Sequence, residues 1–266
     1  MGIVAMRVLF AALLLCWPAS GADLLIQSAV DYELQPLLSA LRNKKEVHIA
    51  AWTFWTGKLG GKSVVISRTD VGPINAAAST ALGVQHFRPK AIINQGTAGA
   101  HDPQLQLWDI VVGEKTTDYS AFRSERGELG AGSDPARWTP FQHRLRLDNR
   151  TLTAFPSFPG DPGLVAAALK VRYTRGRLVK GNIGSAYQYN RELDRILWLR
   201  KTYGTDSEDM ESAYAAGVAV AMKVPFVAIR IISDTEWSHP QLEQIAGEYC
   251  ARFVLEYAVS LKLRAR

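Results

Sequence analysis

The sequence predicts an α/β fold, and three observations support that prediction. Short apolar runs alternate with helical stretches along residues 23–266, which is the pattern of strands connected by helices. Hydrophobic residues make up 47% of the 266 residues and charged residues 21%, so the chain can bury a substantial core and is neither disordered nor collagen-like. No internal repeat and no linker is visible, so we expect one domain over residues 23–266.

The first elements are expected to be a strand, a helix and a hairpin. Leu24–Ala29 is a short apolar run, and Asp31–Arg42 has helical periodicity with acidic residues in its first turn. Val47–Thr56 and Ser63–Arg68 are expected to be paired strands, because two adjacent glycines between them favour a tight turn. A helix of small residues follows over Pro73–His86, since proline is well tolerated in a first helical turn.

Two further strands precede a long segment without clear periodicity. Ala91–Asn94 is a buried strand that ends in a glycine-rich loop, and Ile110–Val112 is another strand. Between Asp118 and Gly160, glycine, proline and arginine are frequent and apolar residues are scattered. Because such a long irregular segment in a compact domain usually has a task, we expect it to help complete the active site or a subunit contact. An ordinary surface insertion is the alternative.

Regular structure resumes after this segment. Cys250 fits the apolar pattern of the last helix, so we expect a buried structural thiol there rather than a nucleophile. The expected elements are the helix Leu164–Arg172, the strand Gly176–Asn182, the helices Asn190–Lys201 and Glu211–Met222, the strand Pro225–Ile232 and the helix Pro240–Leu263.

The N-terminal segment has the order of parts of a secretory signal peptide. A single positive charge in Met1–Arg7 precedes the apolar run Val8–Trp17, which Pro18 and small residues follow. The run is too short to span a bilayer, so we expect cleavage of residues 1–22 near Asp23 and an exported, periplasmic or secreted protein. An uncleaved anchor is the alternative. Cleavage leaves one cysteine, so the mature chain can form no internal disulfide.

The charge balance alone permits a nucleic acid or a membrane surface as a partner, because 31 Lys and Arg against 25 Asp and Glu give a net charge of +6. The basic residues are dispersed, however, and a group of arginines lies in the irregular segment rather than on a regular face. We therefore expect no nucleic-acid partner. Apart from the N-terminal run there is no long apolar stretch, which excludes a protein with several membrane spans.

Polar groups follow the ends of several apolar runs, where open α/β sheets gather their ligands. They lie in residues 31–33, 94–99, 209–211 and 233–234. Taken singly, each group has a structural explanation, because acidic residues commonly cap helices or end strands. Their order and local sequence are more informative.

Five segments carry a family resemblance. They are Ala-Val-Asp-Tyr-Glu at 29–33, Asp-Val-Gly-Pro-Ile-Asn-Ala-Ala at 70–77, Asn-Gln-Gly-Thr-Ala-Gly at 94–99, Asp-Met-Glu-Ser-Ala at 209–213 and Val-Pro-Phe-Val-Ala-Ile-Arg-Ile-Ile-Ser-Asp at 224–234. In this order they resemble the nucleoside phosphorylase and nucleosidase superfamily, and within it the 5′-methylthioadenosine/S-adenosylhomocysteine nucleosidases. The likeness covers essentially the whole chain after residue 23. The last two segments are specific together, whereas the Gly-Thr-Ala-Gly segment alone is weak.

The resemblance implies a fold and an activity. The fold is a three-layer α/β/α sandwich around a central mixed, partly barrel-like sheet. The activity is hydrolysis of the N-glycosidic bond of a purine nucleoside, a 5′-substituted adenosine such as 5′-methylthioadenosine or S-adenosylhomocysteine, with release of adenine. It implies no cofactor and no metal, a small nucleoside substrate as partner, and a homodimer.

The resemblance also implies roles for the matching positions. Asp234 matches the purine-side acid, Glu33 the carboxylate that activates water, and Glu211 the carboxylate that holds the ribose hydroxyls. The matching substrate-binding positions are Ser233 supporting the acid, Arg230 near the attacking water, Met210 under the sugar, Tyr187 stacked on the base, Gln188 reading the purine edge through its backbone, the backbone of Thr97, Ala98 and Gly99, and Val30 and Val71.

The chemistry independently requires these residue types. Loss of adenine leaves an oxocarbenium-like sugar and puts negative charge on the purine, so a carboxylic acid near N7 must donate a proton. Asp234 must then be protonated, which requires a raised pKa. An ionised Glu33 can take a proton from water, and Glu211 can accept hydrogen bonds from both ribose hydroxyls. Glycines in residues 96–99 let the backbone approach the ligand closely.

Several positions depart from the nucleosidase pattern. They leave every catalytic group in place but leave the 5′-substituent and the exact base open, because polar atoms added at the base pocket need partners. The departures are Val30 where Met is common, Asp70 where Gly is common, Ser185 in place of Asp, Tyr187 in place of Phe and Gln188 in place of an aliphatic residue.

Two alternative functions remain on the same fold. A nucleoside phosphorylase needs cations around phosphate, yet residues 28–33 carry two acids and no glycine, which favours water over phosphate. A secreted non-catalytic nucleoside-binding or storage protein is the second alternative. It has no evident reason to keep Glu33, Glu211 and Asp234 together, because like charges in one pocket cost stability.

Overall fold

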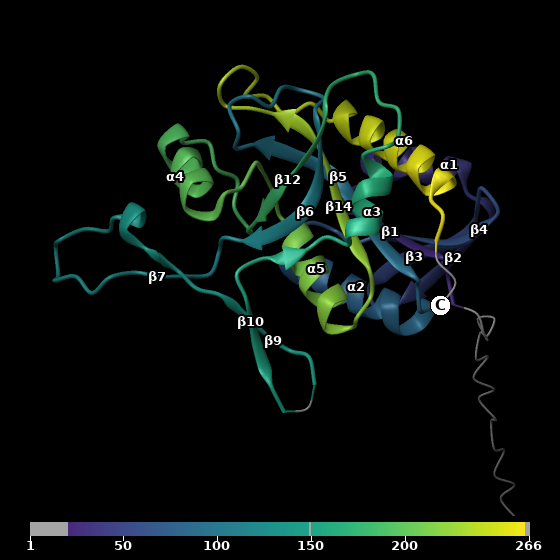
Figure 1. Ribbon diagram of the computed structural model, residues 1–266, viewed down its shortest axis with the longest axis horizontal. Helices are drawn as coiled ribbons and strands as arrows, with labels where there is room; N and C mark the ends of the chain where they lie inside the picture. The colour runs from purple at the N-terminus through teal and green to yellow at the C-terminus, as the bar shows by residue number, and fades with distance from the viewer. Residues whose placement is uncertain (1–20, 149, 264–266) are drawn as a thin grey trace, which may run out of the picture.

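A central mixed sheet organises the computed structural model, which describes residues 21–148 and 150–263 (Figure 1). The predicted signal peptide therefore lies almost wholly outside the described residues. The described part of the sheet has ten strands. They are β1 (Leu24–Ser28), β2 (Arg42–Ile49), β3 (Trp52–Leu59), β4 (Lys62–Arg68), β5 (Ala91–Ala100), β6 (Ile110–Asp118), β11 (Phe158–Pro159), β12 (Leu178–Ser185), β13 (Ser207–Asp209) and β14 (Phe226–Asp234).

Part of the sheet closes on itself. β5 pairs with β14, β14 with β6, β6 with β12, β12 with β13, and β13 returns to β5. Four of the remaining strands extend from β5 through β1, β4 and β3 to β2 at the edge, and the fifth, β11, pairs with β6. Parallel and antiparallel pairs both occur, so the sheet is mixed and partly barrel-like, as the resemblance implied.

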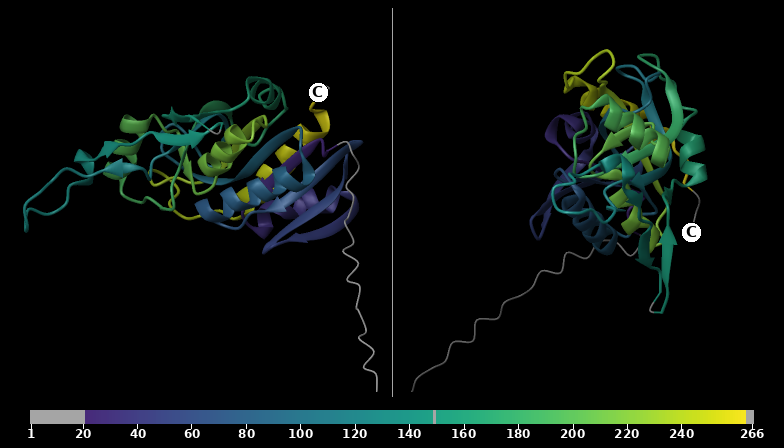
Figure 2. Two further views of the ribbon diagram at one scale, coloured as in Figure 1. Left: turned by 90° about the horizontal axis from the view of Figure 1, so that it is seen from below. Right: turned by 90° about the vertical axis from the view of Figure 1, so that its left-hand side faces the viewer.

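Helices cover the sheet on two faces, and each face has its own apolar core (Figures 1 and 2). One core joins α1, α3 and α6 to the sheet, and the other joins α2 and α5 to it. This arrangement confirms the predicted three-layer fold. The helices are α1 (Asp31–Ala40), α2 (Pro73–Phe87), α3 (Pro162–Ala168), α4 (Leu193–Tyr203), α5 (Ser212–Ala221) and α6 (Ile245–Ser260). None of them, in the described ranges, is long and apolar enough to cross a bilayer.

The first hairpin differs from the prediction. The helix predicted to reach Arg42 ends at Ala40, and the single strand predicted over residues 47–56 is two antiparallel strands, β2 and β3. A turn at Ala50 divides them with a φ of 51° at an alanine, so the usual turn residues give no signal there. β2 is exposed and basic, as suits an edge strand. The predicted pairing of β3 with β4 is confirmed.

Several other boundaries also moved. The glycine-rich residues 96–99, expected as a loop after a strand ending at Asn94, belong to β5 itself, and β6 continues past Val112 to Asp118. The last helix begins at Ile245 rather than Pro240. Residues 235–244 instead form a loop that returns to β14, because the Glu243 amide donates to the Ser233 carbonyl at 3.0 Å.

The segment without periodicity contains short strands. At its ends it joins the central sheet through β6 and β11, and in between two small hairpins project from the body (Figure 2). We call residues 121–157 the arm. Its elements are β7 (Phe122–Arg123), a 3₁₀ turn (Pro135–Arg137), β8 (Thr139–Pro140), β9 (His143–Arg146) and β10 (Leu152–Phe155).

Candidate active site

Glu33 lies buried at the start of α1 and faces the glycine-rich part of β5. Its carboxylate accepts hydrogen bonds from the Thr97 amide at 2.9 Å and the Thr97 hydroxyl at 3.0 Å, and from the Ala29 amide at 3.1 Å. Burial raises the pKa of Glu33, and the Thr97 bonds and the Arg230 charge oppose that rise. A side chain at Gly96 would not fit, because its Cβ would lie 2.7 Å from Glu33 Oε1.

Asp234 ends β14 and is buried. Its Oδ1 accepts a hydrogen bond from the Ser233 hydroxyl at 2.7 Å, and its Oδ2 accepts one from the Tyr189 hydroxyl at 2.9 Å. Burial raises the pKa of Asp234, and these two hydrogen bonds oppose that rise. The backbone of β5 passes close by, because a Cβ on Gly99 would lie 3.2 Å from Asp234 Oδ2.

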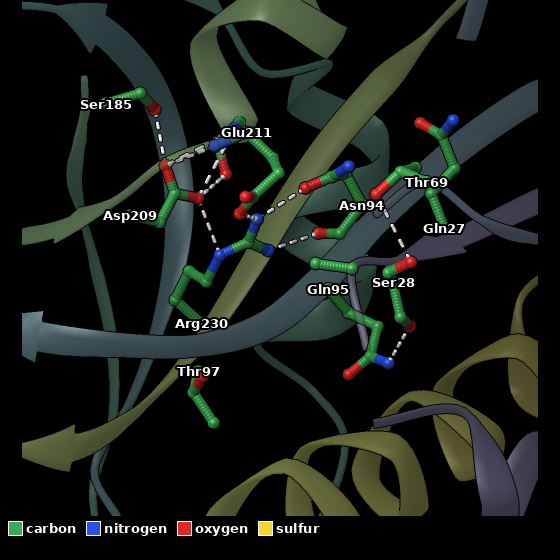
Figure 3. A network of polar contacts seen from close by, with 12 residues as sticks. Gln27, Ser28, Thr69, Asn94, Gln95, Thr97, Ser185, Asp209, Glu211 and Arg230 are labelled. Atoms are coloured by element: carbon green, nitrogen blue, oxygen red, sulfur yellow. Dashed lines mark hydrogen bonds and ion pairs between the residues drawn. The ribbon is translucent and has the colours of Figure 1, made fainter. Parts of the chain in front are cut away.

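Glu211 directly precedes α5 and reaches across to the loop before α2. Its Oε1 accepts a hydrogen bond from the Gly72 amide at 2.8 Å, and its Oε2 lies 3.9 Å from Arg230 Nη2. Burial, together with the charge of Asp209, raises the pKa of Glu211 to about 8. Arg230 thus lies between the carboxyl groups of Glu211 and Asp209 and interacts with both (Figure 3).

Arg230 is buried in β14 and is held on all sides by the protein (Figure 3). Its Nε forms an ion pair with Asp209 Oδ2 at 2.6 Å, and its Nη2 donates to Asn94 Oδ1 at 2.6 Å. Asp209 in turn accepts hydrogen bonds from the hydroxyls of Ser185, at 2.5 Å, and Ser212. The sequence prediction placed Arg230 near an attacking water. In the structure both Nη groups donate to protein oxygens and Nε is paired with Asp209, so the guanidinium supports the carboxylates from behind.

The three predicted catalytic carboxyls converge around one phenol. Tyr32 is half-buried, and its pKa is raised by burial and then by the negative charges of Glu33, Glu211 and Asp234. A hydrogen bond with the Thr97 side chain opposes this rise in the pKa of Tyr32. Glu33 lies against Gly96 of β5, and Asp234 lies against Gly99 of the same strand. Glu211 lies 3.9 Å from Arg230, whose partner on β5 is Gly96, so the three acids gather at the glycine-rich end of β5.

The other predicted site residues lie around this cluster with different exposure. Tyr187 is 69% exposed and its ring covers Gly72, where an added Cβ would lie 2.9 Å from Tyr187 Cε2. Ala98 is buried, and its carbonyl accepts the Ser233 hydroxyl at 3.3 Å. Thr97, Gly99, Val30, Gln188 and Met210 are partly buried, and Val71 is exposed beside Gly72.

Four residues of the site were given no role by the sequence, although three of them lie in the polar segments 31–33, 94–99 and 209–211. Asp209 and Asn94 hold Arg230, Tyr189 contacts Asp234, and Tyr32 lies among the carboxyls. Asp209 had a usable signal, since it stands beside two predicted site residues in one motif. Tyr189 had none, because 45 positions separate it from Asp234 and spacing says nothing about so long a reach.

A large groove among the described residues lies elsewhere. It measures about 1130 Å³ and is lined by Lys90 and Ala91 at the start of β5 and by Pro225 just before β14. The carboxyl cluster lies toward the opposite, carboxyl ends of these two parallel strands. The groove therefore belongs to a separate part of the surface.

Comparison with known proteins identifies the family. A family model described as the phosphorylase superfamily matches residues 23–258. The chain belongs to the phosphorylase superfamily. This membership confirms the resemblance found in the sequence.

Relatives of this phosphorylase-superfamily chain are named as nucleosidases. A 5′-methylthioadenosine/S-adenosylhomocysteine nucleosidase from Psychromonas ingrahamii is 30% identical over 87% of this chain and 96% of its own length. The protein of that name from Actinobacillus succinogenes is 31% identical over 79% of this chain and 84% of its own. A solved structure of such a nucleosidase from Colwellia psychrerythraea, in complex with adenine, is 25% identical with a TM-score of 0.71, covering 90% of this chain and 95% of that one.

Proposed function

We propose that this protein hydrolyses the N-glycosidic bond of a 5′-substituted adenosine, such as 5′-methylthioadenosine or S-adenosylhomocysteine, and releases adenine. One observation carries the proposal, the gathering of Glu33, Glu211 and Asp234 at the glycine-rich end of β5. The names of the relatives give the substrate class. A non-catalytic storage role would leave three buried acids with raised pKa values without a purpose.

Asp234 is the proposed general acid. Its raised pKa keeps a proton available, and that proton passes to purine N7 while the electron pair of the C1′–N9 bond goes to the leaving base. The carboxylate that results accepts hydrogen bonds from Ser233 and Tyr189, so the charge left behind is stabilised. Burial and hydrogen bonding therefore act at different stages of the same step.

Glu33 and Glu211 are assigned to the sugar side. Glu33, fixed by Thr97 and the Ala29 amide, takes a proton from the water that attacks C1′. Glu211, fixed by the Gly72 amide, accepts the ribose hydroxyls. The negative charge of ionised Glu33 also favours the oxocarbenium-like sugar of the transition state.

Water rather than phosphate is the proposed nucleophile. Arg230 is the buried cation nearest to Glu211, and it is already engaged by Asp209 and Asn94. A phosphate beside Glu33 would face an acidic group without a free cation supplied by this arginine. The same arrangement accepts a neutral water molecule readily.

The test is release of free base from a substrate panel. Purified protein is incubated with adenosine, inosine, 5′-methylthioadenosine and S-adenosylhomocysteine, each with and without phosphate. We expect adenine release from a 5′-substituted adenosine that does not depend on phosphate. Phosphate-dependent release would instead support a phosphorylase, and tight nucleoside binding without release from any substrate would support a binding protein.

We further propose that the protein is exported and acts as a homodimer. The order of charged, apolar and small residues in residues 1–22 supports export. Exposed apolar side chains on the arm, Leu129, Phe141 and Leu152, support contact with a second copy.

A further inference from the structure

The catalytic acid has a partner that reaches it from a surface loop. Tyr189 lies between β12 and α4, and its side chain is 49% exposed, yet its hydroxyl donates to Asp234 Oδ2 at 2.9 Å. Ser233, by contrast, is the sequence neighbour of Asp234 and contacts Oδ1. The Tyr189 contact therefore depends on where the loop of residues 186–192 is held.

Asn190 anchors that loop on a buried carboxylate. The Asn190 amide donates to Glu208 Oε1 at 2.9 Å, and its side-chain Nδ2 donates to Glu208 Oε2 at 2.5 Å. The same Nδ2 lies 3.1 Å from the hydroxyl of Tyr119. Because Asn190 directly follows Tyr189, these bonds limit the positions that the Tyr189 ring can take.

Glu208 is itself locked from the other side. The hydroxyl of Tyr119 donates to Glu208 Oε2 at 2.6 Å, and His101 Nε2 lies 3.0 Å from the same oxygen. His101 Nδ1 lies 2.7 Å from Thr205 Oγ1, which fixes its ring. Although burial acts to raise the pKa of Glu208, these partners lower it, so the group is an ionised acceptor inside the protein. The proposed mechanism uses none of these residues.

We propose that Tyr189 and Asn190 are positioning residues for the general acid, with Asn190 clamped on Glu208 so that the Tyr189 hydroxyl stays on Asp234. The inference deepens the proposed function and rests on it. When the Asp234 proton passes to purine N7, Asp234 becomes a carboxylate. The hydrogen bond that it accepts from the Tyr189 hydroxyl is then stronger than the bond to the neutral acid. Tyr189 keeps its own proton throughout, so it stabilises the product of the transfer without taking part in it.

The other groups around Asp234 set the direction of the expected effect. Glu208 on β13 and Glu236 after β14 disfavour the ionised acid, and Ser233 favours it. Arg191, in the same loop as Tyr189, is paired with Glu236 at 2.8 Å, and Tyr32 on α1 faces the site with a neutral phenol. Removing the Tyr189 hydroxyl therefore leaves Asp234 with one hydrogen bond and two acidic neighbours.

The first test is the pH profile of Tyr189→Phe. Activity requires protonated Asp234 and falls as pH rises through its pKa, so loss of the hydroxyl should move the upper limb of kcat/KM to higher pH by about 0.5 to 1. At pH values below that limb, kcat should fall about 2- to 10-fold. Adenine affinity measured against pH gives the same titration without turnover.

The second test separates positioning from a general effect on the fold. Asn190→Ala changes no charge and should shift the upper limb in the same direction, while the double variant with Tyr189→Phe should shift no further than Tyr189→Phe alone. Tyr173→Phe is the control, because it loses a hydroxyl bond of 2.6 Å, to the Trp108 carbonyl, away from the acid. If Asn190→Ala does not fold, Tyr119→Phe replaces it as the weaker disruption of the clamp.

The outcomes distinguish this inference from the proposed function. An unchanged limb in Tyr189→Phe, or a double variant with summed shifts, overturns the positioning role while hydrolysis stands. Absence of base release by the unchanged protein overturns the proposed function. The adenine titration then still tests whether Tyr189 acts on Asp234, and an unchanged profile there overturns the contact as well.

Discussion

Burial pushes the three carboxyls of the site toward their protonated forms, and local partners decide how far each one goes. Glu33 accepts two hydrogen bonds from Thr97, and Asp234 accepts hydrogen bonds from two hydroxyl groups. Glu211 accepts one hydrogen bond from a backbone amide, and the charge of Asp209 on the far side of Arg230 acts on it as well. Three residues of one chemical type are thereby suited to different roles. Environment rather than residue type makes the assignment.

Replacing the acid is the sharpest test at the scale of single residues. Asp234→Asn keeps the shape and can still accept a hydrogen bond, but it cannot give N7 an acidic proton. Since general acid catalysis contributes about 10²- to 10⁴-fold, turnover should fall by that order in the base-release assay, with little change in thermal midpoint. Asp194→Asn, an exposed aspartate in the first turn of α4, should behave as wild type. Near-normal release by Asp234→Asn would show that another group is the acid.

Glu211 gives a prediction about stability and pH. Its pKa of about 8 in the folded protein is above its ordinary value of 4.5, so the folded state binds a proton that the unfolded state loses between those values. The contribution of this group to the free energy of unfolding is fully present below about pH 4.5, and it declines by about 1.4 kcal/mol per pH unit toward pH 8. Glu211→Gln should therefore show a thermal midpoint that falls less from pH 5 to pH 8 than that of wild type. Glu128→Gln, on an exposed glutamate, should keep the wild-type dependence, and equal slopes in all three proteins would contradict the assignment.

The sequence indicated the site unevenly at this scale. Glu33, Glu211 and Asp234 each lie in a sequence motif at an end of a regular element, so the sequence alone could indicate them. Tyr189 could not, because its position depends on the Glu208 clamp, whose members come from four separate segments of the chain. Contacts between segments that are far apart in the chain produce no recognisable pattern of spacing in the sequence.

At the scale of elements, the glycine-rich half of β5 decides how closely the acids approach the sheet. Gly96 lies against Glu33 and Gly99 against Asp234, so the same strand accommodates two of the acids. The sequence pattern suggested a loop there because glycines usually end strands. They serve here instead as places where a strand can pass close to buried side chains.

A single methyl group should test this role. The Cβ of Gly96→Ala would lie 2.7 Å from Glu33 Oε1, so the carboxylate must move away from the Thr97 amide. Base release should fall at least about 10-fold, and overpacking should lower stability by about 1 to 3 kcal/mol. Gly127→Ala is the matched control, because nothing lies within 4 Å of its added Cβ. Equal activity in the two variants would refute the close approach of β5 to Glu33.

The turn between β2 and β3 shows where element prediction failed and why. Residues 47–56 read as one strand because alanines at 50 and 51 interrupt neither the hydrophobicity nor the apolar pattern. The chain nevertheless reverses there, with Ala50 at a positive φ. Pairing along the whole of β3 outweighs the local cost of that backbone conformation.

At the scale of the whole molecule, export makes a prediction about the first residues that the structure describes. Ala22 is buried, its amide donates to the Phe87 carbonyl at 2.8 Å, and its carbonyl accepts the Lys90 amide at 3.0 Å. Cleavage that keeps these bonds leaves Ala22 in the mature protein. N-terminal sequencing of the protein from the cell envelope should therefore begin at Gly21 or Ala22, just before the expected start at Asp23. Recovery of the intact chain from the cytoplasm would contradict export.

The arm is the feature that the body of the fold does not require. Its base is fixed by His143 against Asp118, at 2.5 Å, and its outer part by Trp198 of α4, whose indole donates to the Ala136 carbonyl at 2.8 Å. Phe122 and Trp138 stack at 4.2 Å, so the first hairpin has an aromatic pair of its own. These contacts give the arm a defined position from which it can meet a second copy.

Three exposed apolar side chains on the arm allow that subunit contact to be tested. If the contact buries Leu129, Phe141 and Leu152, replacing all three with serine should convert a dimer to a monomer in sedimentation velocity at micromolar concentration, because each loses about 1 to 2 kcal/mol of apolar burial. The fold should persist, since none of the three is part of either main core. A matched variant with serine at Val71 and Ile74, exposed apolar residues outside the arm, should remain dimeric. A monomeric unchanged protein, or a dimer that survives the triple replacement, would leave the arm without a role in assembly.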